Sequence, residues 1–393
     1  QVMVKFVTKL PPELRVAPTP FAIPTRLARR GLSEVINHLL QLDPPHPFEF
    51  LIDSDLLRTS VAVHLKRTKR SLETVLEMEY FEALSKPKHS NVFEHEDWVS
   101  SVLDPNIDDV ILSGAFDNMV RAWDLEEDSK EALESVQAHS DAISSMVLLS
   151  RNQAKNEFTF ATGCKDSSVK VWTATVTEEG VQIDPLALGQ AHNSSVNALA
   201  AGASSSVQGV SLLVSGSADH TLIMWDANMD PEEQTQSLKR RRTKNRTPVL
   251  HELSMLRVLE GHRDVVTGVS LAGKENIVSG SWDKTIRFWD TESGAALNAV
   301  HSSAAISCLQ QHSRSTIIVT GHTDTIIRVW DPRSFDGSMM KKGLRSHKGW
   351  VSAVDWHPTK EHLLASSSYD GTVKVWDVRS KIPLHTLSTH DDR

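Results

Sequence analysis

The sequence is poor in cysteine and tyrosine, and it has no long apolar run. Its 393 residues include two cysteines and two tyrosines. Both cysteines, Cys164 and Cys308, lie in strand-like segments, where a free thiol behaves as a small apolar side chain. This usage fits a reducing compartment. Because no run of about 18 apolar residues occurs, we expect no membrane-spanning helix.

Charge and motifs exclude further classes of protein. The formal net charge is −8, which argues against broad coating of nucleic acid, although local basic patches remain possible. The sequence contains no G-x-x-x-x-G-K-[ST], H-E-x-x-H, G-x-S-x-G or C-x-x-C motif. We therefore predict that the protein is not an enzyme and has no cofactor of its own.

Tryptophan, in contrast, is frequent, and six of the ten tryptophans recur in one local pattern. Six segments end alike, in VRAWD, VKVWT, LIMWD, IRFWD, IRVWD and VKVWD. An aspartate precedes each tryptophan by six residues, and a histidine lies upstream of each aspartate. The six sets are His95, Asp117 and Trp123; His139, Asp166 and Trp172; His192, Asp219 and Trp225; His262, Asp283 and Trp289; His301, Asp324 and Trp330; His347, Asp370 and Trp376.

Each repeat has the pattern of a four-stranded sheet. Alternating apolar residues indicate the strands, and clusters of Gly, Asp and Ser indicate the turns. One such sheet cannot cover both its faces, whereas sheets stacked radially cover each other. Over roughly residues 94–390 the pattern resembles the WD40 family, which predicts a β-propeller.

The repeated histidines and aspartates allow two interpretations. They could be metal ligands or a proton relay, or they could form a hydrogen-bond network that ties each turn to the tryptophan of its own blade. Metal ligands must converge on one point, whereas these residues recur once per blade. Buried polar groups need partners, and WD40 domains use these positions in that way. We therefore favour the structural network.

The C-terminal repeat predicts a seventh blade. After Trp376 the segment LHTLSTH resembles the outer strand and the histidine that precede another blade, and about three further strands would be needed to complete that blade. Closure of a WD40 ring would take the outer strand of the last blade from residues 90–94. We expect a seven-bladed propeller whose last blade is incomplete in this chain, because an open arc would leave strand edges exposed.

The first 82 residues lack the repeat and predict an α+β domain. VMVKFVT alternates like a strand, a second strand is expected near residues 14–18, and GLSEVINHLL has helical spacing. FEFLID, a short strand and turn in LLRTSVAVHL, and VLEMEY complete the order. This order resembles the ubiquitin-like grasp fold. We place this domain at residues 1–82, a linker and the start of the closure strand at 83–93, and the propeller at 94–393.

A ubiquitin-like domain followed by a WD40 propeller is an uncommon pair. With GLSEVINHLL, FEFLID, LLRTS and HEDWVSS, the whole chain resembles the Ytm-type WD-repeat family of ribosome biogenesis. That resemblance implies a nucleolar and nucleoplasmic factor that acts on precursors of the large ribosomal subunit. It implies a propeller that binds the WD40 assembly factor known as block of proliferation, and through it Pescadillo. It also implies that the ubiquitin-like domain is bound by midasin, an AAA ATPase with a metal-ion-dependent adhesion site.

The resemblance assigns the midasin contact to one carboxylate, which on this sequence is Glu73. An exposed carboxylate can complete the coordination shell of the partner's Mg²⁺, a hard cation that prefers oxygen ligands. The alternative is an ordinary solvated carboxylate. Asp53 and Asp55 are the fallback candidates, and Lys69 and Arg70 could form a basic rim or be simple exposed charge.

A long insertion interrupts the repeats at residues 227–255. It contains a basic run, which predicts a nuclear import signal or, as a second interpretation, a contact with ribosomal RNA. The run has no interleaved aromatic residues, which argues against base stacking. Its residues are Lys239, Arg240, Arg241, Arg242, Lys244 and Arg246.

Two other functions stay open at this point. A WD40 substrate receptor or adaptor of the ubiquitin pathway would have the same domain types, but it would bind through an apolar patch on the sheet rather than through Glu73. A direct RNA-binding protein would depend on the basic run and show strong salt dependence.

Overall fold

The structure is a computed structural model. It describes residues 1–70, 74–88, 91–107, 109–125, 131–177, 179–203, 211–228, 250–271, 276–333 and 339–388. The described chain divides into two compact units. The first has residues 1–88 together with 377–381, and the second has residues 91–376 together with 382–388. In the described part of the chain, no helix has the length and apolar character that a membrane span requires.

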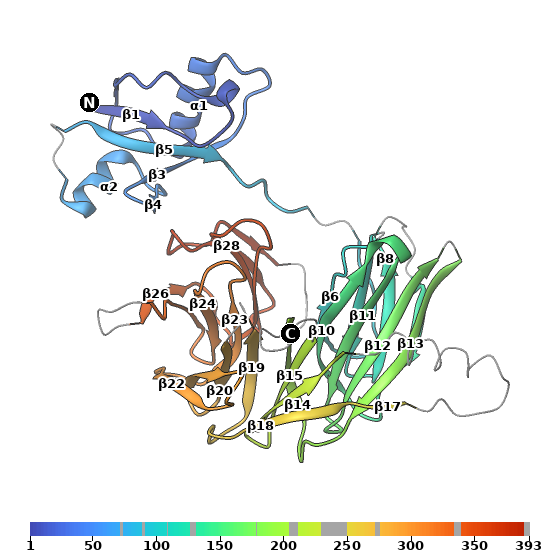
Figure 1. The fold of residues 1–393 in the computed structure, drawn as a ribbon. Helices are drawn as coiled ribbons and strands as arrows, with labels where there is room; N and C mark the ends of the chain where they lie inside the picture. Colours follow the sequence, from blue (N-terminus) through green and yellow to red (C-terminus); the bar gives the residue numbers. More distant parts are fainter. Residues whose placement is uncertain are drawn as a thin grey trace. The chain divides into compact units, whose positions relative to one another are not determined.

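The N-terminal unit is one mixed sheet with two helices (Figure 1). Strands β1 and β5 pair in parallel at its centre, and the sheet order is β2-β1-β5-β3-β4. The first elements are β1 (Val2–Val7), the 3-10 helix η1 (Pro12–Leu14), β2 (Phe21–Ile23) and α1 (Arg29–Leu40). The remaining elements are β3 (Phe48–Ile52), β4 (Asp55–Leu56), α2 (Val61–Thr68) and β5 (Leu76–Glu82).

One face of this sheet forms the core, because alternate side chains of a strand point to the same side. Val4, Phe6, Phe50 and Met78 are almost fully buried, and Ile36 of α1 packs into the same cluster. The opposite face carries charged side chains together with the exposed Met3. Lys5 and Lys9 form ion pairs there with Glu77 and Glu79, at 3.3 and 3.7 Å.

Two sequence-based expectations for this unit were wrong. The second strand is Phe21–Ile23 rather than a segment near residues 14–18, where Pro18 has no backbone N–H to donate to a ladder. The segment expected to give a short strand and turn, residues 56–65, begins in the short strand β4, but its second half is the start of the helix α2, whose buried residues are Val61, His64 and Leu65. The unit also extends past residue 82, since the Ala83 amide donates to the Pro47 carbonyl at 2.8 Å.

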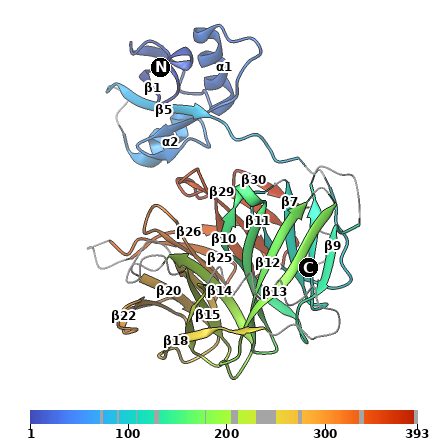
Figure 2. The same cartoon turned by 45° about the vertical axis from the view of Figure 1, so that its right-hand side comes forward.

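In the described residues, the C-terminal unit is a β-propeller of six sheets, here called blades 1–6 (Figure 2). Five of the sheets have four strands, and that of blade 2 has the short strand β17 (His251–Glu252) as a fifth. Blade 1 consists of β6 (Val99–Leu103), β7 (Val110–Ala115), β8 (Met119–Asp124) and β9 (Glu134–Gln137). Blade 2 consists of β10 (Ile143–Asn152), β11 (Glu157–Cys164), β12 (Val169–Thr177) and β13 (Gly180–Gly189), with the 3-10 helix η2 (Gln153–Lys155) between its first two strands. Blade 3 consists of β14 (Val196–Ala203), β15 (Ser211–Ser217), β16 (Leu222–Asp226) and β18 (Ser254–Leu259).

The last three blades follow the same plan. Blade 4 consists of β19 (Val266–Leu271), β20 (Asn276–Ser281), β21 (Thr285–Asp290) and β22 (Ala296–His301). Blade 5 consists of β23 (Ile306–Gln311), β24 (Ile318–His322), β25 (Ile326–Trp330) and β26 (Met340–Arg345). Blade 6 consists of β27 (Val351–Trp356), β28 (Leu363–Ser368), β29 (Val373–Asp377) and β30 (His385–Leu387).

Successive blades pack through their first strands, in the order β6, β10, β14, β19, β23 and β27. A glycine in the second strand permits this approach in blades 1–5. A Cβ atom on Gly216 would lie 2.6 Å from Val266 of blade 4, and one on Gly280 would lie 2.8 Å from Ile306 of blade 5. Blade 6 carries Ser367 at the corresponding position.

The described residues contain no strand of a seventh blade. Residues 91–94, expected to supply its outer strand, are not in a strand. They are held to blade 1 instead, because the Phe93 ring packs 4.8 Å from that of Trp123 and the Asn91 amide donates to the Leu125 carbonyl. The LHTL segment contributes β30, which completes blade 6.

The long insertion also ends earlier than expected. Strand β16 ends at Asp226, and the short strand β17 (His251–Glu252) already pairs in parallel with β13 of blade 2. Strand β18 then starts at Ser254, so residues 251–255 belong to the propeller rather than to the insertion. The basic run Lys239–Arg246 lies outside the described residues.

Candidate functional site

In blades 2, 3, 4 and 6, the repeated histidine, aspartate and tryptophan lie in one hydrogen-bond network. In blade 3, the Trp225 indole N–H donates to the Ser215 hydroxyl at 2.8 Å, and that hydroxyl lies 2.7 Å from Nε2 of His192. Nδ1 of His192 is 3.0 Å from the Asp219 carboxylate. The corresponding histidine–aspartate distances are 3.3 Å for His139 and Asp166, 2.8 Å for His262 and Asp283, and 3.1 Å for His347 and Asp370.

A hydroxyl that the sequence analysis missed links histidine to tryptophan in every blade. It always lies ten residues before the tryptophan, and this spacing is the sequence signal that could have found it. The residues are Ser113, Thr162, Ser215, Ser279, Thr320 and Ser366, all of which accept the indole hydrogen bond at 2.7 or 2.8 Å.

Blade 1 has the same hydroxyl link but a different partner for the aspartate. His95 bonds to Ser113 at 2.7 Å, as does Trp123. The Asp117 carboxylate lies 2.7 Å from the Arg121 guanidinium. An arginine thus neutralises the turn carboxylate in this blade.

Blade 5 shows that the placement of His301 in the network was wrong. His301 is exposed at the end of β22 in blade 4, where it pairs with Thr285. It precedes the first strand residue Ile306 by five positions rather than the four of the other blades, and this shift moves it out of the network position.

His322, within β24, takes its role in blade 5. Its Nε2 lies 2.7 Å from the Thr320 hydroxyl, which also accepts from Trp330. Its Nδ1 lies 3.2 Å from each of two backbone carbonyls. The aspartate again pairs with an arginine, since Asp324 contacts Arg328 at 2.5 and 3.0 Å.

The networks require neutral histidine. Nε2 accepts from a hydroxyl, so the ring proton sits on Nδ1 and faces the carboxylate or carbonyl. Burial lowers the pKa of His139, His192 and His347 below the ordinary imidazole value, although the neighbouring aspartates oppose the shift. Burial, with the charge of Arg328, lowers the pKa of His322 to about 4.

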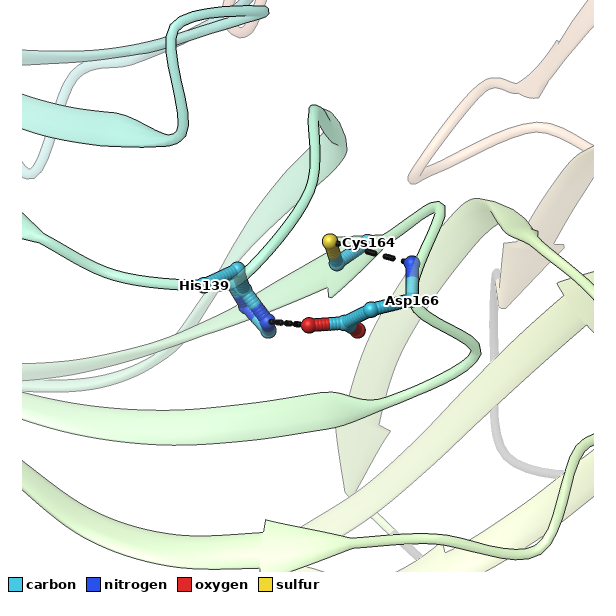
Figure 3. A group of neighbouring side chains, drawn as sticks. All are labelled: His139, Cys164 and Asp166. Atoms are coloured by element: carbon cyan, nitrogen blue, oxygen red, sulfur yellow. Dashed lines mark hydrogen bonds and ion pairs between the residues drawn. The ribbon is translucent and has the colours of Figure 1, made fainter.

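Blade 2 contains a group that resembles a metal site. His139, Cys164 and Asp166 offer ligand atoms that all lie within 4.8 Å of one another, and Figure 3 shows Asp166 next to both other residues. The Cys164 sulfur already donates to the Asp141 carbonyl at 3.0 Å and accepts from the Asp166 amide at 3.3 Å. Burial raises the pKa of its thiol to about 12, whereas metal ligands are thiolates.

The other blades explain this group. Ser217, Ser281 and Ser368 occupy the position of Cys164 and make the same two hydrogen bonds, to a carbonyl and from the turn aspartate's amide. Cys164 is therefore a variant of a repeated serine, and the group is a hydrogen-bond network rather than a metal centre.

Glu73 lies outside the described residues. The nearest described elements before and after it in the sequence are α2 and β5. Lys69 ends α2 in a left-handed conformation, and the Arg70 amide donates to the Leu65 carbonyl at 3.1 Å.

Both fallback carboxylates have arginine partners. Asp53 is 2.7 Å from the Arg70 guanidinium, and Asp55 is 3.5 Å from that of Arg67. The β3–β4 turn therefore lies next to the C-terminal end of α2. Arg70 serves here as a partner of Asp53, and its side chain is partly exposed.

Comparison with known proteins covers both units. The NLE (NUC135) domain family matches residues 2–65. The WD domain, G-beta repeat family matches residues 86–124, 130–173, 184–226, 253–290, 297–331 and 338–377.

Curated relatives match the whole chain. A Chlamydomonas reinhardtii protein named ribosome biogenesis protein WDR12 homolog is 36% identical over 413 residues, covering 100% of this chain and 90% of that protein. A rice (Oryza sativa subsp. japonica) protein of the same name is 34% identical over 404 residues, covering 100% of this chain and 91% of that protein. The ribosome biogenesis protein YTM1 of Vanderwaltozyma polyspora is 32% identical over 421 residues, covering 100% of this chain and 89% of that protein.

Proposed function

The chain belongs to the WDR12/YTM1 family of ribosome biogenesis proteins, and we propose that it serves ribosome assembly as a non-catalytic adaptor with two binding ends. The family match over both units carries this proposal. In the described propeller, the network histidines, aspartates and hydroxyls form hydrogen bonds with one another or with neighbouring groups of the same blade. This arrangement fits a scaffold rather than a catalyst.

The specific action that we propose is on precursors of the large ribosomal subunit, in the nucleolus and nucleoplasm. The propeller binds a WD40 assembly factor of the block-of-proliferation family, which connects it to a Pescadillo-family protein. The N-terminal unit binds midasin, whose ATP-driven movement releases the protein from the pre-ribosome.

Glu73 is the residue proposed to reach the Mg²⁺ of the midasin adhesion site, because an exposed carboxylate can complete the shell of a hard cation. The ion pairs of the two fallback carboxylates support the choice. Asp53 and Asp55 are already paired with arginines, and breaking those pairs would oppose their use as metal ligands. The protein itself needs no metal ion in this arrangement.

The ion pairs on the outer face of the N-terminal sheet argue against a ubiquitin-pathway adaptor. That function would use an apolar patch on the sheet, whereas this face carries the Lys5–Glu77 and Lys9–Glu79 ion pairs. An apolar receptor surface would have to desolvate these charges without pairing them.

Binding of the full-length chain to a midasin adhesion-site domain tests the proposal. We expect binding in Mg²⁺, its loss in chelator, and its loss in the variant Glu73→Gln, which keeps the side-chain shape but removes the charge. Asp53→Asn is the matched control and should still bind. Binding that survives both chelator and Glu73→Gln would show that this carboxylate has no docking role.

A second experiment tests the propeller end and the basic run separately. The variant Glu73→Gln should still co-purify with the partner WD40 factor, because the propeller and the N-terminal unit bind their partners independently.

Replacing Lys239, Arg240, Arg241, Arg242, Lys244 and Arg246 with alanine should abolish nuclear accumulation of a tagged chain. Unchanged accumulation would remove the import function from this run.

A further inference from the structure

Every blade places two side chains next to each other at the aspartate turn. One residue lies three positions after the network histidine, or after Ser302 in blade 5, and the other directly precedes the turn aspartate. The amide of the second donates to the carbonyl of the first in all six blades, at 2.9–3.2 Å. The pairs are Trp98 and Phe116; Ala142 and Lys165; Ser195 and Ala218; Val265 and Trp282; Ala305 and Thr323; Trp350 and Tyr369.

The backbone therefore repeats at these positions while the side chains vary, with two aromatic residues in blades 1 and 6 and smaller pairs elsewhere, such as in blade 3. Blade 3 shows that the fold accepts a small pair, Ser195 and Ala218. Blade 6 instead exposes Trp350 and Tyr369, which are 51% and 50% accessible. Large exposed aromatic side chains that the fold does not require are typical of binding surfaces.

These two rings bound a cleft of ≈ 710 Å³, which Lys348, Gly349 and Asp370 also line. The rings meet nearly edge to face, with their centroids 6.3 Å apart and their planes at 87°. Gly349 lets the two turns close, because a Cβ atom there would lie 2.7 Å from the Asp370 amide nitrogen. The cleft is thus lined by two aromatic rings that are nearly perpendicular to each other and by the turns that carry them.

The charges in the cleft select the occupant. The Asp370 carboxylate already accepts hydrogen bonds from the Lys348 amide, His347, and the amide and hydroxyl of Thr372. The Lys348 ammonium, in contrast, forms no ion pair with any residue that the structure describes, and the residue is exposed. The available charge beside the aromatic walls is therefore positive.

We propose that this cleft binds a short acidic segment of a protein partner, with one aromatic or aliphatic side chain packed against the exposed surfaces of Trp350 and Tyr369 and a carboxylate on Lys348. A protein segment fits better than single-stranded RNA. RNA binding needs a row of cations along the phosphates, whereas this lining has one lysine next to the Asp370 carboxylate. This inference does not rest on the proposed docking through Glu73.

Fluorine NMR of the full-length chain labelled with 5-fluorotryptophan tests it, with the Trp350 signal assigned from Trp350→Ser. The probe is the peptide acetyl-Gly-Glu-Phe-Glu-Gly-amide. We expect it to shift the Trp350 signal at millimolar concentration. Peptides with lysine in place of both glutamates, or alanine in place of phenylalanine, should bind at least fivefold more weakly.

Two variants make the test specific. Tyr369→Ala copies Ala218 of blade 3, so the fold should tolerate it, and it should weaken the acidic peptide at least tenfold. Lys348→Glu should reverse the preference in favour of the lysine peptide. Phe116→Ala, in blade 1, is the matched control and should leave the Trp350 shift unchanged.

Four results would overturn the proposal. The first is no Trp350 shift with any peptide, and the second is equal shifts with the acidic and lysine peptides. The third is peptide binding that Tyr369→Ala does not weaken. The fourth is a Trp350 shift produced by hexauridylate, a single-stranded RNA added as a further probe, and by no peptide. The last result would assign the cleft to RNA.

Discussion

Blades 3 and 5 stabilise the same turn carboxylate in different ways. In blade 3, Asp219 accepts from His192, which is supplied by the loop before the first strand. In blade 5, Asp324 pairs with Arg328 from the third strand, and the histidine comes from the second strand instead. What the repeat conserves is therefore a partner for the carboxylate and an acceptor for the hydroxyl, not the position of one residue type.

Because blade 5 uses an arginine where blade 3 uses a histidine, we expect the largest loss of stability when Arg328 is replaced. Arg328→Met keeps the apolar length of the side chain but leaves the Asp324 carboxylate without its ion pair. Because the Arg328 side chain is only 7% exposed, we expect blade 5 to lose about 3 kcal/mol of local stability. Amide hydrogen exchange in β24 and β25 measures this loss. Unchanged exchange there would mean that the ion pair contributes nothing.

Lowering the pH should destabilise blade 5 through His322. Its pKa is about 4 in the folded chain and about 6.5 unfolded, so between these values the unfolded chain binds the extra proton. The contribution of neutral His322 to the free energy of unfolding is fully present above pH 6.5. This contribution falls as the pH drops toward 4, by on the order of 2 kcal/mol. Thermal unfolding across this range should show a shallower decline in His322→Ser than in the unaltered chain. An equal decline in both would exclude His322 as the cause.

Moving the network histidine of blade 5 from the second strand to the loop before the first strand should give this blade the arrangement of blade 3. His322→Ser removes the acceptor for Thr320, which should cost about 1.5 kcal/mol. Adding Ser302→His places a histidine four residues before Ile306, as in the other blades, and should restore much of the loss. Exchange protection of the Trp330 indole hydrogen reports both changes. A double variant no better than the single one would show that the loop position alone is not sufficient.

The smallest effect is expected at Cys164, where blade 2 departs least from the others. Cys164→Ser copies Ser217 and should change the melting temperature by no more than about 1 °C, equivalent to less than about 0.5 kcal/mol. Cys164→Ala removes both hydrogen bonds and should cost about 1 kcal/mol. Added Zn²⁺ should not raise the melting temperature of either form. A zinc-dependent rise lost in Cys164→Ser would restore the metal interpretation.

The sequence predicted those features that recur at a constant spacing. Aspartate and tryptophan are six residues apart in all repeats, and this spacing placed six blades without coordinates. The prediction for His301 was wrong because one extra residue separates it from the first strand of blade 5, so His301 lies at the end of β22 and not in the loop that carries the other network histidines. The replacement, His322, lies within a strand segment where no histidine was expected. Its role depends on contacts between strands, which a linear pattern does not contain.

The N-terminal unit has no internal repeat to correct errors, and its short elements were misplaced. Pro18 and Pro20 hid the start of β2, and α2 has eight residues, too few for a clear helical period. The ion pairs of Asp53 and Asp55 with arginines of α2 depend on that helix, so they were not predicted. Glu73 itself was assigned by resemblance, and it stays a prediction.

The glycine beneath each following blade has a consequence for how such a chain can grow. The contact is shared between repeats, since Gly216 belongs to one blade and Val266 to the next. A duplicated whole repeat therefore carries both the glycine that the following blade packs against and the apolar first-strand residue that packs against the glycine of the preceding blade. Such a repeat fits between its neighbours without further substitution. A duplication that begins or ends inside a blade separates these two residues, so whole-repeat copying is the route by which this architecture gains length at the least cost.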